Sequence, residues 1–223
     1  KTVPYIVVRP MIAPGQRSDN PVYAKYAVAA LRDFMADYPV DPKQIHLSGL
    51  SMGGETVWHV ALEAPEIFVT VSSIMGRQHD DPDLIARTLK NHTVFIAVGD
   101  RDREGFVIGS RAMRQALEKA GADLVYVELP NRGHDIWVHY VLNPQYYEWL
   151  LLHKKGKQVE SRAGAAEMAR WADRPTGDPQ YAAFAKRLQA RFHRFQKWWF
   201  IENCGRTERV GPQRKALGKR NVF

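Results

Sequence analysis

Ser51 lies in a sequence pattern that can turn a serine hydroxyl into a nucleophile. It is the centre of a Gly-x-Ser-x-Gly pattern with Gly49 and Gly53, which follows a predicted strand over residues 44–47 and precedes a helical pattern. A turn this tight requires positions without side chains, and it holds the serine hydroxyl clear of the sheet. The helix that follows directs its first backbone N–H groups, including that of Met52, toward the same point, where they can stabilise an oxyanion.

A serine hydroxyl is a weak nucleophile unless a histidine accepts its proton and an acid orients that histidine. Two later strands end in residues of these types: Asp100 and Asp102 follow residues 93–98, and His134 follows residues 124–129. In open α/β sheets ligands bind at the carboxyl ends of the strands, so we expect these side chains to lie near the serine. The chain order Ser, Asp, His is typical of enzymes with such a serine turn.

The strands and helices predicted around these residues indicate an α/β fold. Strands and helices alternate along the chain, and most strands are apolar on both faces, which is typical of a parallel sheet covered by helices on both sides. The predicted strands cover residues 3–9, 44–47, 68–75, 93–98 and 124–129, and the predicted helices cover residues 21–38, 52–64, 83–90, 110–120 and 138–152.

Composition indicates one folded domain with an appendage. The chain has 223 residues, of which 45% are hydrophobic and 11% aromatic, and this is enough for one sizeable core. A disulfide-stapled miniprotein, a collagen-like repeat and a wholly disordered chain are therefore excluded. The single cysteine, Cys204, excludes an intramolecular disulfide and a cysteine-based zinc site. No apolar run approaches the roughly 20 residues of a membrane-spanning helix, and no targeting signal can be read.

Charge divides the chain after residue 153. Residues 1–153 carry 15 Lys and Arg against 18 Asp and Glu, a net charge of −3, whereas residues 154–223 carry 17 against 6, a net charge of +11. We therefore predict a domain over 1–153 and a basic, largely helical extension over 154–223 that ends in a partly extended tail. Three roles stay open for the extension: docking on the domain, contact with an anionic membrane or nucleic acid, and dimerisation. No recognisable nucleic-acid motif accompanies it.

Further motifs make residues 3–153 resemble a known superfamily. They resemble the C-terminal two-thirds of an α/β-hydrolase catalytic domain, of the group of esterases and predicted peptidases related to prolyl oligopeptidases and to feruloyl and polyester-cleaving esterases. The motifs that carry the likeness are residues 5–10, 40–42, 44–54, Trp58, Gly99 with Asp102, Gly133-His134-Asp135 with Trp137, and residues 147–151. The resemblance implies a three-layer α/β-hydrolase fold with a mostly parallel sheet.

The resemblance also assigns roles to the candidate residues. It implies that Ser51 is the nucleophile, His134 the general base and Asp102 the orienting acid, with the Met52 N–H in the oxyanion hole. Asp102 is favoured over Asp100 because the family pattern is a glycine, two residues, the acid, and a serine eight residues later that begins the next helix. Residues 103–106 depart from the family pattern of prolines after the acid, so the geometry of this turn is less firmly implied than that of the serine.

A second departure concerns the start of the chain. In these hydrolases the strand before the one predicted over residues 3–9 ends in a His-Gly loop that supplies another oxyanion donor, and the sequence has no His-Gly dipeptide. We therefore expect an α/β-hydrolase domain that is incomplete at its N-terminus. Loss of one oxyanion donor typically costs about 100- to 1,000-fold in turnover.

Three other positions are weighed for the site. Arg77 follows a buried strand at its carboxyl end, and Trp137 follows the histidine motif, so both are candidates to contact substrate. His79 with its neighbouring aspartates could suggest a metal site, but a polar turn that caps the next helix is favoured, and no metal or cofactor is expected. His46, His59, His139 and His153 are expected to be ordinary core or surface residues.

These features favour a serine hydrolase that cleaves carboxylic esters through an acyl-enzyme intermediate. Two alternatives remain: a peptidase of the prolyl-oligopeptidase type, and a hydrolase-fold binding module that acts through its basic extension. The expected partner is a small-molecule or polymer ester. The compartment is left open by the residues, although the resemblance points toward an exported protein, secreted or periplasmic.

Overall fold

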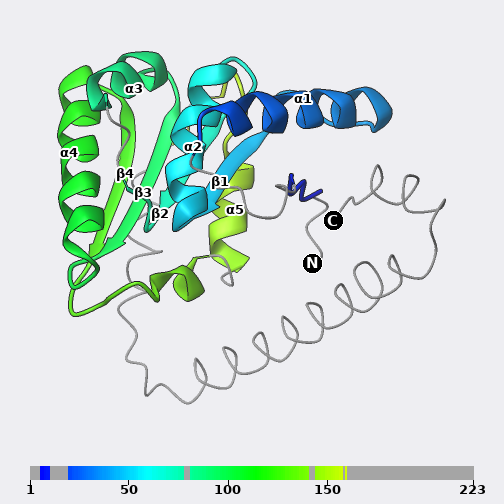
Figure 1. The fold of residues 1–223 in the computed structure, drawn as a ribbon. Coiled ribbons are helices and arrows are strands. Elements are labelled where there is room, and N and C mark those ends of the chain that lie inside the picture. Colours follow the sequence, from blue (N-terminus) through cyan, green and yellow to red (C-terminus); the bar gives the residue numbers. More distant parts are fainter. Residues whose placement is uncertain (1–5, 11–19, 78–80, 141–143, 158, 160–223) are drawn as a thin grey trace. The chain divides into compact units, whose positions relative to one another are not determined.

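The computed structural model describes residues 6–10, 20–77, 81–140, 144–157 and 159 (Figure 1). Helices and strands alternate within these residues. In chain order the elements are α1 (Val22–Asp37), β1 (His46–Leu50), α2 (Met52–Glu63), β2 (Thr70–Ile74), α3 (Pro82–Leu89), β3 (Thr93–Gly99), α4 (Glu104–Ala120), β4 (Asp123–Leu129), the 3₁₀ helix η1 (Ile136–His139) and α5 (Pro144–Leu152).

The four strands form one parallel sheet in the order β1-β2-β3-β4. Their carboxyl ends meet at one edge, which confirms the predicted α/β class. The fifth predicted strand, over residues 3–9, is wrong for the residues that the structure describes. Residues 6–10 form neither helix nor strand, and residues 6–9 belong to a different compact unit from the sheet. A short β-branched run alone does not make a strand, because a strand needs a hydrogen-bonded neighbour.

Side chains that alternate along the strands build a core on each face of the sheet. In β3, Val94 and Ile96 belong to the core shared with α1 to α4, and Phe95 and Ala97 belong to the core shared with η1 and α5. All four are at most 1% exposed. This alternation is the period of two expected of a strand buried on both faces, and it gives the three layers that the resemblance implied.

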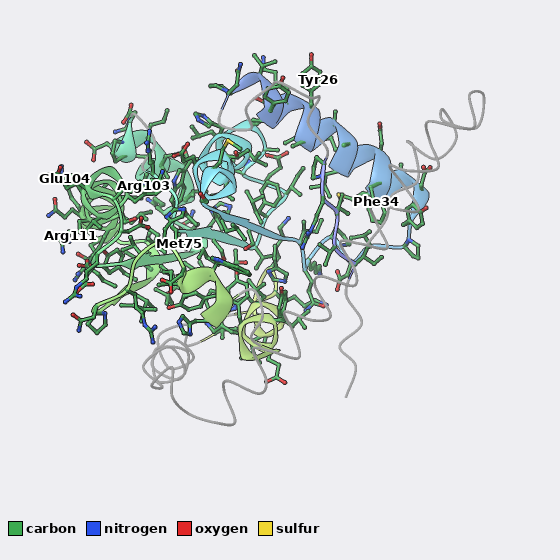
Figure 2. All side chains as sticks on the ribbon, turned by 60° about the horizontal axis from the view of Figure 1, so that its bottom comes forward. Tyr26, Phe34, Met75, Arg103, Glu104 and Arg111 are labelled. Atoms are coloured by element: carbon green, nitrogen blue, oxygen red, sulfur yellow. The ribbon has the colours of Figure 1, made fainter. Side chains whose placement is uncertain are left out.

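Two helices differ from the sequence prediction. The helix predicted from residue 110 begins at Glu104, six residues earlier, directly after the turn that carries the acidic candidates (Figure 2). The helix predicted over 138–152 is divided into η1 and α5, and α5 begins at Pro144. A proline lacks the N–H that continues a helix, and its fixed φ suits the first position of a new one.

Polar side chains accept hydrogen bonds at the starts of two predicted helices, although only at α3 does the side chain belong to the N-cap residue. The Asn20 side chain accepts a hydrogen bond from the Val22 N–H at 3.0 Å, next to the first turn of α1. At α3, Asp81 is the N-cap and its carboxylate accepts from the Leu84 N–H at 2.8 Å. A polar residue in the turn before α3 therefore caps this helix, as the sequence indicated.

The chain after α5 turns back toward the connection between α1 and β1. Lys154 Nζ lies 2.7 Å from an Asp41 carboxylate oxygen, and the Lys155 N–H donates to the Lys43 carbonyl at 3.0 Å. The predictions for residues 160–223, including the long helix and its docking or dimerisation, lie outside the described residues. Among the helices that are described, none is long and apolar enough to cross a membrane.

Candidate active site

Ser51 occupies a strained turn between β1 and α2. Its φ and ψ are 54° and −121°, a positive φ that non-glycine residues rarely adopt. The Ser51 N–H donates to the Ile74 carbonyl at 2.8 Å, which attaches the turn to the carboxyl end of β2. Because α2 begins at the next residue, Met52, the first N–H groups of the helix have no partner within it and lie beside the serine.

The glycines around the turn meet different steric requirements. A Cβ added at Gly49 would overlap the Gly53 backbone, so the close approach requires a glycine at residue 49. A Cβ added at Gly53 would meet nothing within 4 Å, so the expectation that Gly53 must lack a side chain is wrong. The second close approach involves Gly54 instead, where a Cβ would lie 2.8 Å from the Gly76 Cα. This contact packs the first turn of α2 against the end of β2.

His134 joins the serine to a carboxylate. Its Nε2 lies 2.8 Å from Ser51 Oγ, and its Nδ1 lies 2.7 Å and 2.9 Å from the two carboxylate oxygens of Asp102. The Asp102 side chain is fully buried, whereas 30% of the His134 side chain is exposed. The Arg103 N–H donates to Asp102 Oδ1 at 2.7 Å, which fixes the carboxylate. The three side chains therefore form a hydrogen-bonded chain from the Ser51 hydroxyl through the imidazole to the Asp102 carboxylate.

The two aspartates of the turn have separate contacts. Asp102 is hydrogen-bonded to His134, whereas Asp100 Oδ1 accepts from the Arg132 N–H at 3.2 Å. The Arg101 N–H also donates to the Arg132 carbonyl, at 2.8 Å. These bonds connect the loop that carries the acid to the loop that carries the histidine. Asp100 thus lies in the structural link between the two loops and not against the imidazole.

Phe106 lies next to the histidine, and Arg77 lies over the Phe106 ring. Phe106 is 5% exposed, and its ring centroid lies 4.8 Å from that of the His134 ring, with the two planes at 65°. The Arg77 guanidinium lies over the Phe106 ring, with Cζ 5.2 Å from the centroid, and Arg77 Nε lies 3.4 Å from a Glu55 carboxylate oxygen. Arg77 is 58% exposed in its side chain and follows β2, so it belongs to the same edge of the sheet as the serine.

The backbone of Met75 is strained at the same edge of the sheet, at the carboxyl end of β2. Figure 2 labels this residue, which follows β2. It is 1% exposed, and its φ is 51°. Its N–H donates to the Ala97 carbonyl at 2.7 Å, so the strand pairing with β3 holds it in this conformation. A bulky residue at positive φ is a strained position of the kind that gathers near functional sites.

Trp137 lies in η1, three residues after His134, and is partly buried against the core on the α5 face. Of the other histidines, His139 and His153 are 3% exposed and belong to the interior. Burial lowers the pKa of each of them below its ordinary value. Of the core or surface locations that the sequence left open for these two histidines, both occupy the core.

His46 is part of a polar layer between β1, β2 and α5. Its Nδ1 lies 3.0 Å from Thr70 Oγ1, and Ser48 Oγ on the same strand lies 2.9 Å from the Tyr146 hydroxyl. The His46 Nε2 atom is buried with no hydrogen-bond partner. Burial, and secondarily the neighbouring His153, lowers the pKa of His46 to about 4, so this imidazole is neutral near pH 7.

The structure provides no support for a metal site in the part of the chain that it describes. No group of three or more His, Cys, Asp or Glu side chains there is arranged to hold a metal ion. His79 and Asp80, from the acidic turn considered above, lie outside the described residues.

A protein-family model identifies the family of this chain. The model of the dienelactone hydrolase family matches residues 16–139, more than half of the chain and all three residues of the serine, histidine and aspartate group. The chain belongs to the dienelactone hydrolase family. No curated protein matches the sequence.

One solved structure shows the fold of this dienelactone hydrolase family chain. The chain is similar to a thermostable esterase with a TM-score of 0.55 and 22% identity, over 60% of this chain and 37% of the esterase. The structure of esterase PE8 gives a TM-score of 0.44 and 25% identity, over 57% of this chain and 61% of the other. This chain spans less than two thirds of the length of either structure. The first comparison confirms the α/β-hydrolase fold that the resemblance implied.

Some residues of the site carry no motif that marks them. Phe106 lies in the stretch where the chain departs from the family pattern, and only the early start of α4 brings its ring to the histidine. Asp100 was noted as a rival acid, but its bond to the histidine loop depends on how two separate loops meet. The helical spacing of residues 104–109 with the later part of α4 is the one sequence signal that could have indicated the earlier start.

Proposed function

We propose that the protein hydrolyses carboxylic esters through an acyl-enzyme intermediate, with Ser51 as nucleophile, His134 as general base and Asp102 as orienting acid. The observation that carries the proposal is the His134 imidazole, which has its Nε2 at 2.8 Å from the Ser51 hydroxyl and its Nδ1 at 2.7 Å from a buried Asp102 oxygen. Membership of a hydrolase family supports the same reaction class.

In the first half of the reaction Ser51 Oγ attacks the ester carbonyl carbon while its proton passes to His134 Nε2. The carbonyl oxygen becomes an oxyanion, which the Met52 N–H at the start of α2 stabilises. The tetrahedral intermediate then breaks its bond to the alcohol oxygen, and this oxygen takes the proton from His134. The products of this half are the free alcohol and an acyl group on Ser51.

In the second half water replaces the alcohol. Its oxygen attacks the acyl carbonyl carbon while His134 Nε2 accepts one of its protons. When the bond to Ser51 breaks, Ser51 Oγ takes that proton and the carboxylic acid leaves. Asp102 keeps the imidazole in the tautomer with a proton on Nδ1 and stabilises the imidazolium in both halves. We propose Arg77 and Trp137 as the residues that contact substrate beside the acyl group.

Hydrolysis of p-nitrophenyl acetate tests the ester reaction, with Ser51→Ala and His134→Gln as controls. We expect release of nitrophenolate by the wild-type protein and loss of nearly all of it in both variants. A parallel assay with peptide p-nitroanilides tests the peptidase alternative, and faster cleavage of the anilides would favour it. Activity that survives in Ser51→Ala would contradict the proposal.

The net charge of +11 on residues 154–223 favours one other function, a binding module that acts on polyanions. Binding to heparin at several salt concentrations tests it. A steep loss of affinity with salt is the result this alternative predicts, because each neutralised anionic group releases a counterion. Elution in modest salt, together with ester hydrolysis, would leave the hydrolase as the better account.

A further inference from the structure

Two hydrogen bonds at opposite nitrogens do not fix an imidazole completely. His134 is bonded to Asp102 through Nδ1 and to Ser51 through Nε2. The ring can still tilt about the line that joins these bonds, and 30% of its side chain is open to solvent. A third contact, on the ring itself, is needed to define the plane in which the Nε2 lone pair points.

Phe106 supplies this contact. Its centroid lies 4.8 Å from that of the imidazole at an angle of 65°, a geometry that aromatic pairs favour. Phe106 is 5% exposed, and with Val98 and Val107 it forms a small separate core cluster. It is anchored by its helix, because the Phe106 N–H donates to the Arg103 carbonyl at 2.8 Å in the first turn of α4.

A second contact, with Arg77, restricts the movement of the Phe106 ring. The Arg77 guanidinium lies over the ring, with Cζ 5.2 Å from its centroid. Arg77 is in turn paired with Glu55, whose side chain is 13% exposed and lies in the first turn of α2. The ring thus contacts both the imidazole and a paired guanidinium, and it links the start of α4 to the start of α2.

We propose that Phe106 is a positioning residue that holds His134 during deacylation, an inference that rests on the proposed function. In the free enzyme the imidazole contacts Asp102, Ser51 and Phe106 among the residues that the structure describes. Once Ser51 is acylated its Oγ has no proton to donate, and the bond to Nε2 is lost. Asp102 and Phe106 then remain to aim Nε2 at the attacking water, so removal of the Phe106 ring slows the second half of the reaction more than the first.

The test compares the two halves in Phe106→Ala, Phe106→Leu and Val107→Ala. Val107 belongs to the same cluster and the same helical turn, so Val107→Ala is a smaller truncation of the same cluster that leaves the Phe106 ring in place. Acylation is followed by the rate of labelling with p-nitrophenyl trimethylacetate in stopped flow. Deacylation is followed by the decay of the isolated acyl-enzyme, measured by intact mass. Circular dichroism checks that each variant is folded. If Phe106→Ala is not folded, the acylation and deacylation rates of Phe106→Leu are compared with those of the wild-type protein instead.

We expect the deacylation rate of Phe106→Ala to fall by about 10- to 100-fold, the scale of effects from misplaced catalytic groups, and its acylation rate to fall much less. Phe106→Leu should recover part of the loss, and Val107→Ala should leave both rates near the wild-type values. Equal losses in both rates, or no loss in either, would overturn the inference. A wild-type protein that forms no acyl adduct would overturn the proposed function instead.

Discussion

Asp102 and Asp100 lie in one turn, are separated by a single residue and differ in what they contact. Asp102 is bonded to the imidazole, and Asp100 is bonded to the Arg132 backbone. We expect Asp102→Asn to lower kcat for p-nitrophenyl acetate by about 10⁴-fold, the loss known for a triad whose histidine takes the wrong tautomer. The matched change Asp100→Asn keeps a side-chain acceptor and should cost less than about tenfold. A larger loss in Asp100→Asn than in Asp102→Asn would show that the acid is wrongly assigned.

His46 should make the stability of the protein depend on pH. Its folded-state pKa of about 4 lies below the ordinary value of 6.5, so between these pH values the unfolded chain binds more protons than the folded one. Stability is therefore retained above about pH 6.5 and lost as the pH falls toward 4. We expect the drop in Tm between pH 7 and pH 4.5 to be smaller in His46→Leu than in the wild-type protein. Thermal melts followed by circular dichroism measure it, and an equal drop in both would contradict this reading.

The residues of the site were predictable to different degrees. Ser51 and His134 follow from local motifs, because the glycine turn and the position after a strand are properties of neighbouring residues. The choice of Asp102 needed a family pattern, since both aspartates follow the same strand. Phe106 could not be found in this way, because its contact with His134 joins two segments 28 positions apart through packing alone.

At the scale of elements, the contact between α2 and the end of β2 determines where the serine lies. Gly54→Ala would place a Cβ 2.8 Å from the Gly76 Cα, and the backbones would have to separate. We expect a loss of about 1 to 3 kcal/mol in the free energy of unfolding, as for other overpacked sites. Gly53→Ala is the matched control, because its Cβ meets nothing within 4 Å, and it should be neutral or stabilising.

Urea denaturation of both variants provides the measurement for this pair. The prediction fails if Gly53→Ala is the less stable protein, because the steric difference between the two positions would then have no effect. Slower ester hydrolysis in Gly54→Ala is also expected, since the same shift moves Ser51 away from His134.

Elements with a continuous pattern were predicted well, and those whose limits depend on tertiary contacts were not. The strands β1 to β4 and the helices α1 to α3 agree with the predictions to within a few residues. The early start of α4 depends on the Arg103 backbone and the buried Phe106, which local propensity does not register. The break between η1 and α5 follows from Pro144, because a proline lacks the N–H that would continue a helix.

At the scale of the whole molecule, Phe95 connects the sheet to the layer that follows the histidine loop. Its ring centroid lies 5.2 Å from that of Tyr140, 5.6 Å from that of Tyr146 and 5.5 Å from that of Trp149, and its side chain is fully buried. We expect Phe95→Ala to lower the free energy of unfolding by about 3 to 5 kcal/mol. Phe95→Leu fills more of the space and should cost less. A loss below about 1 kcal/mol in Phe95→Ala, measured in urea, would mean that this layer contributes little to stability.

The most direct test of the central claim is intact-mass spectrometry after exposure to a fluorophosphonate probe. The probe reports an activated serine without requiring the right substrate, and Ser51→Ala is its control. We predict one adduct on the wild-type protein, much slower labelling in His134→Gln, and no adduct on Ser51→Ala. An adduct that persists in Ser51→Ala, or labelling that is as fast without His134, would contradict the assignment of Ser51 and His134 as nucleophile and base.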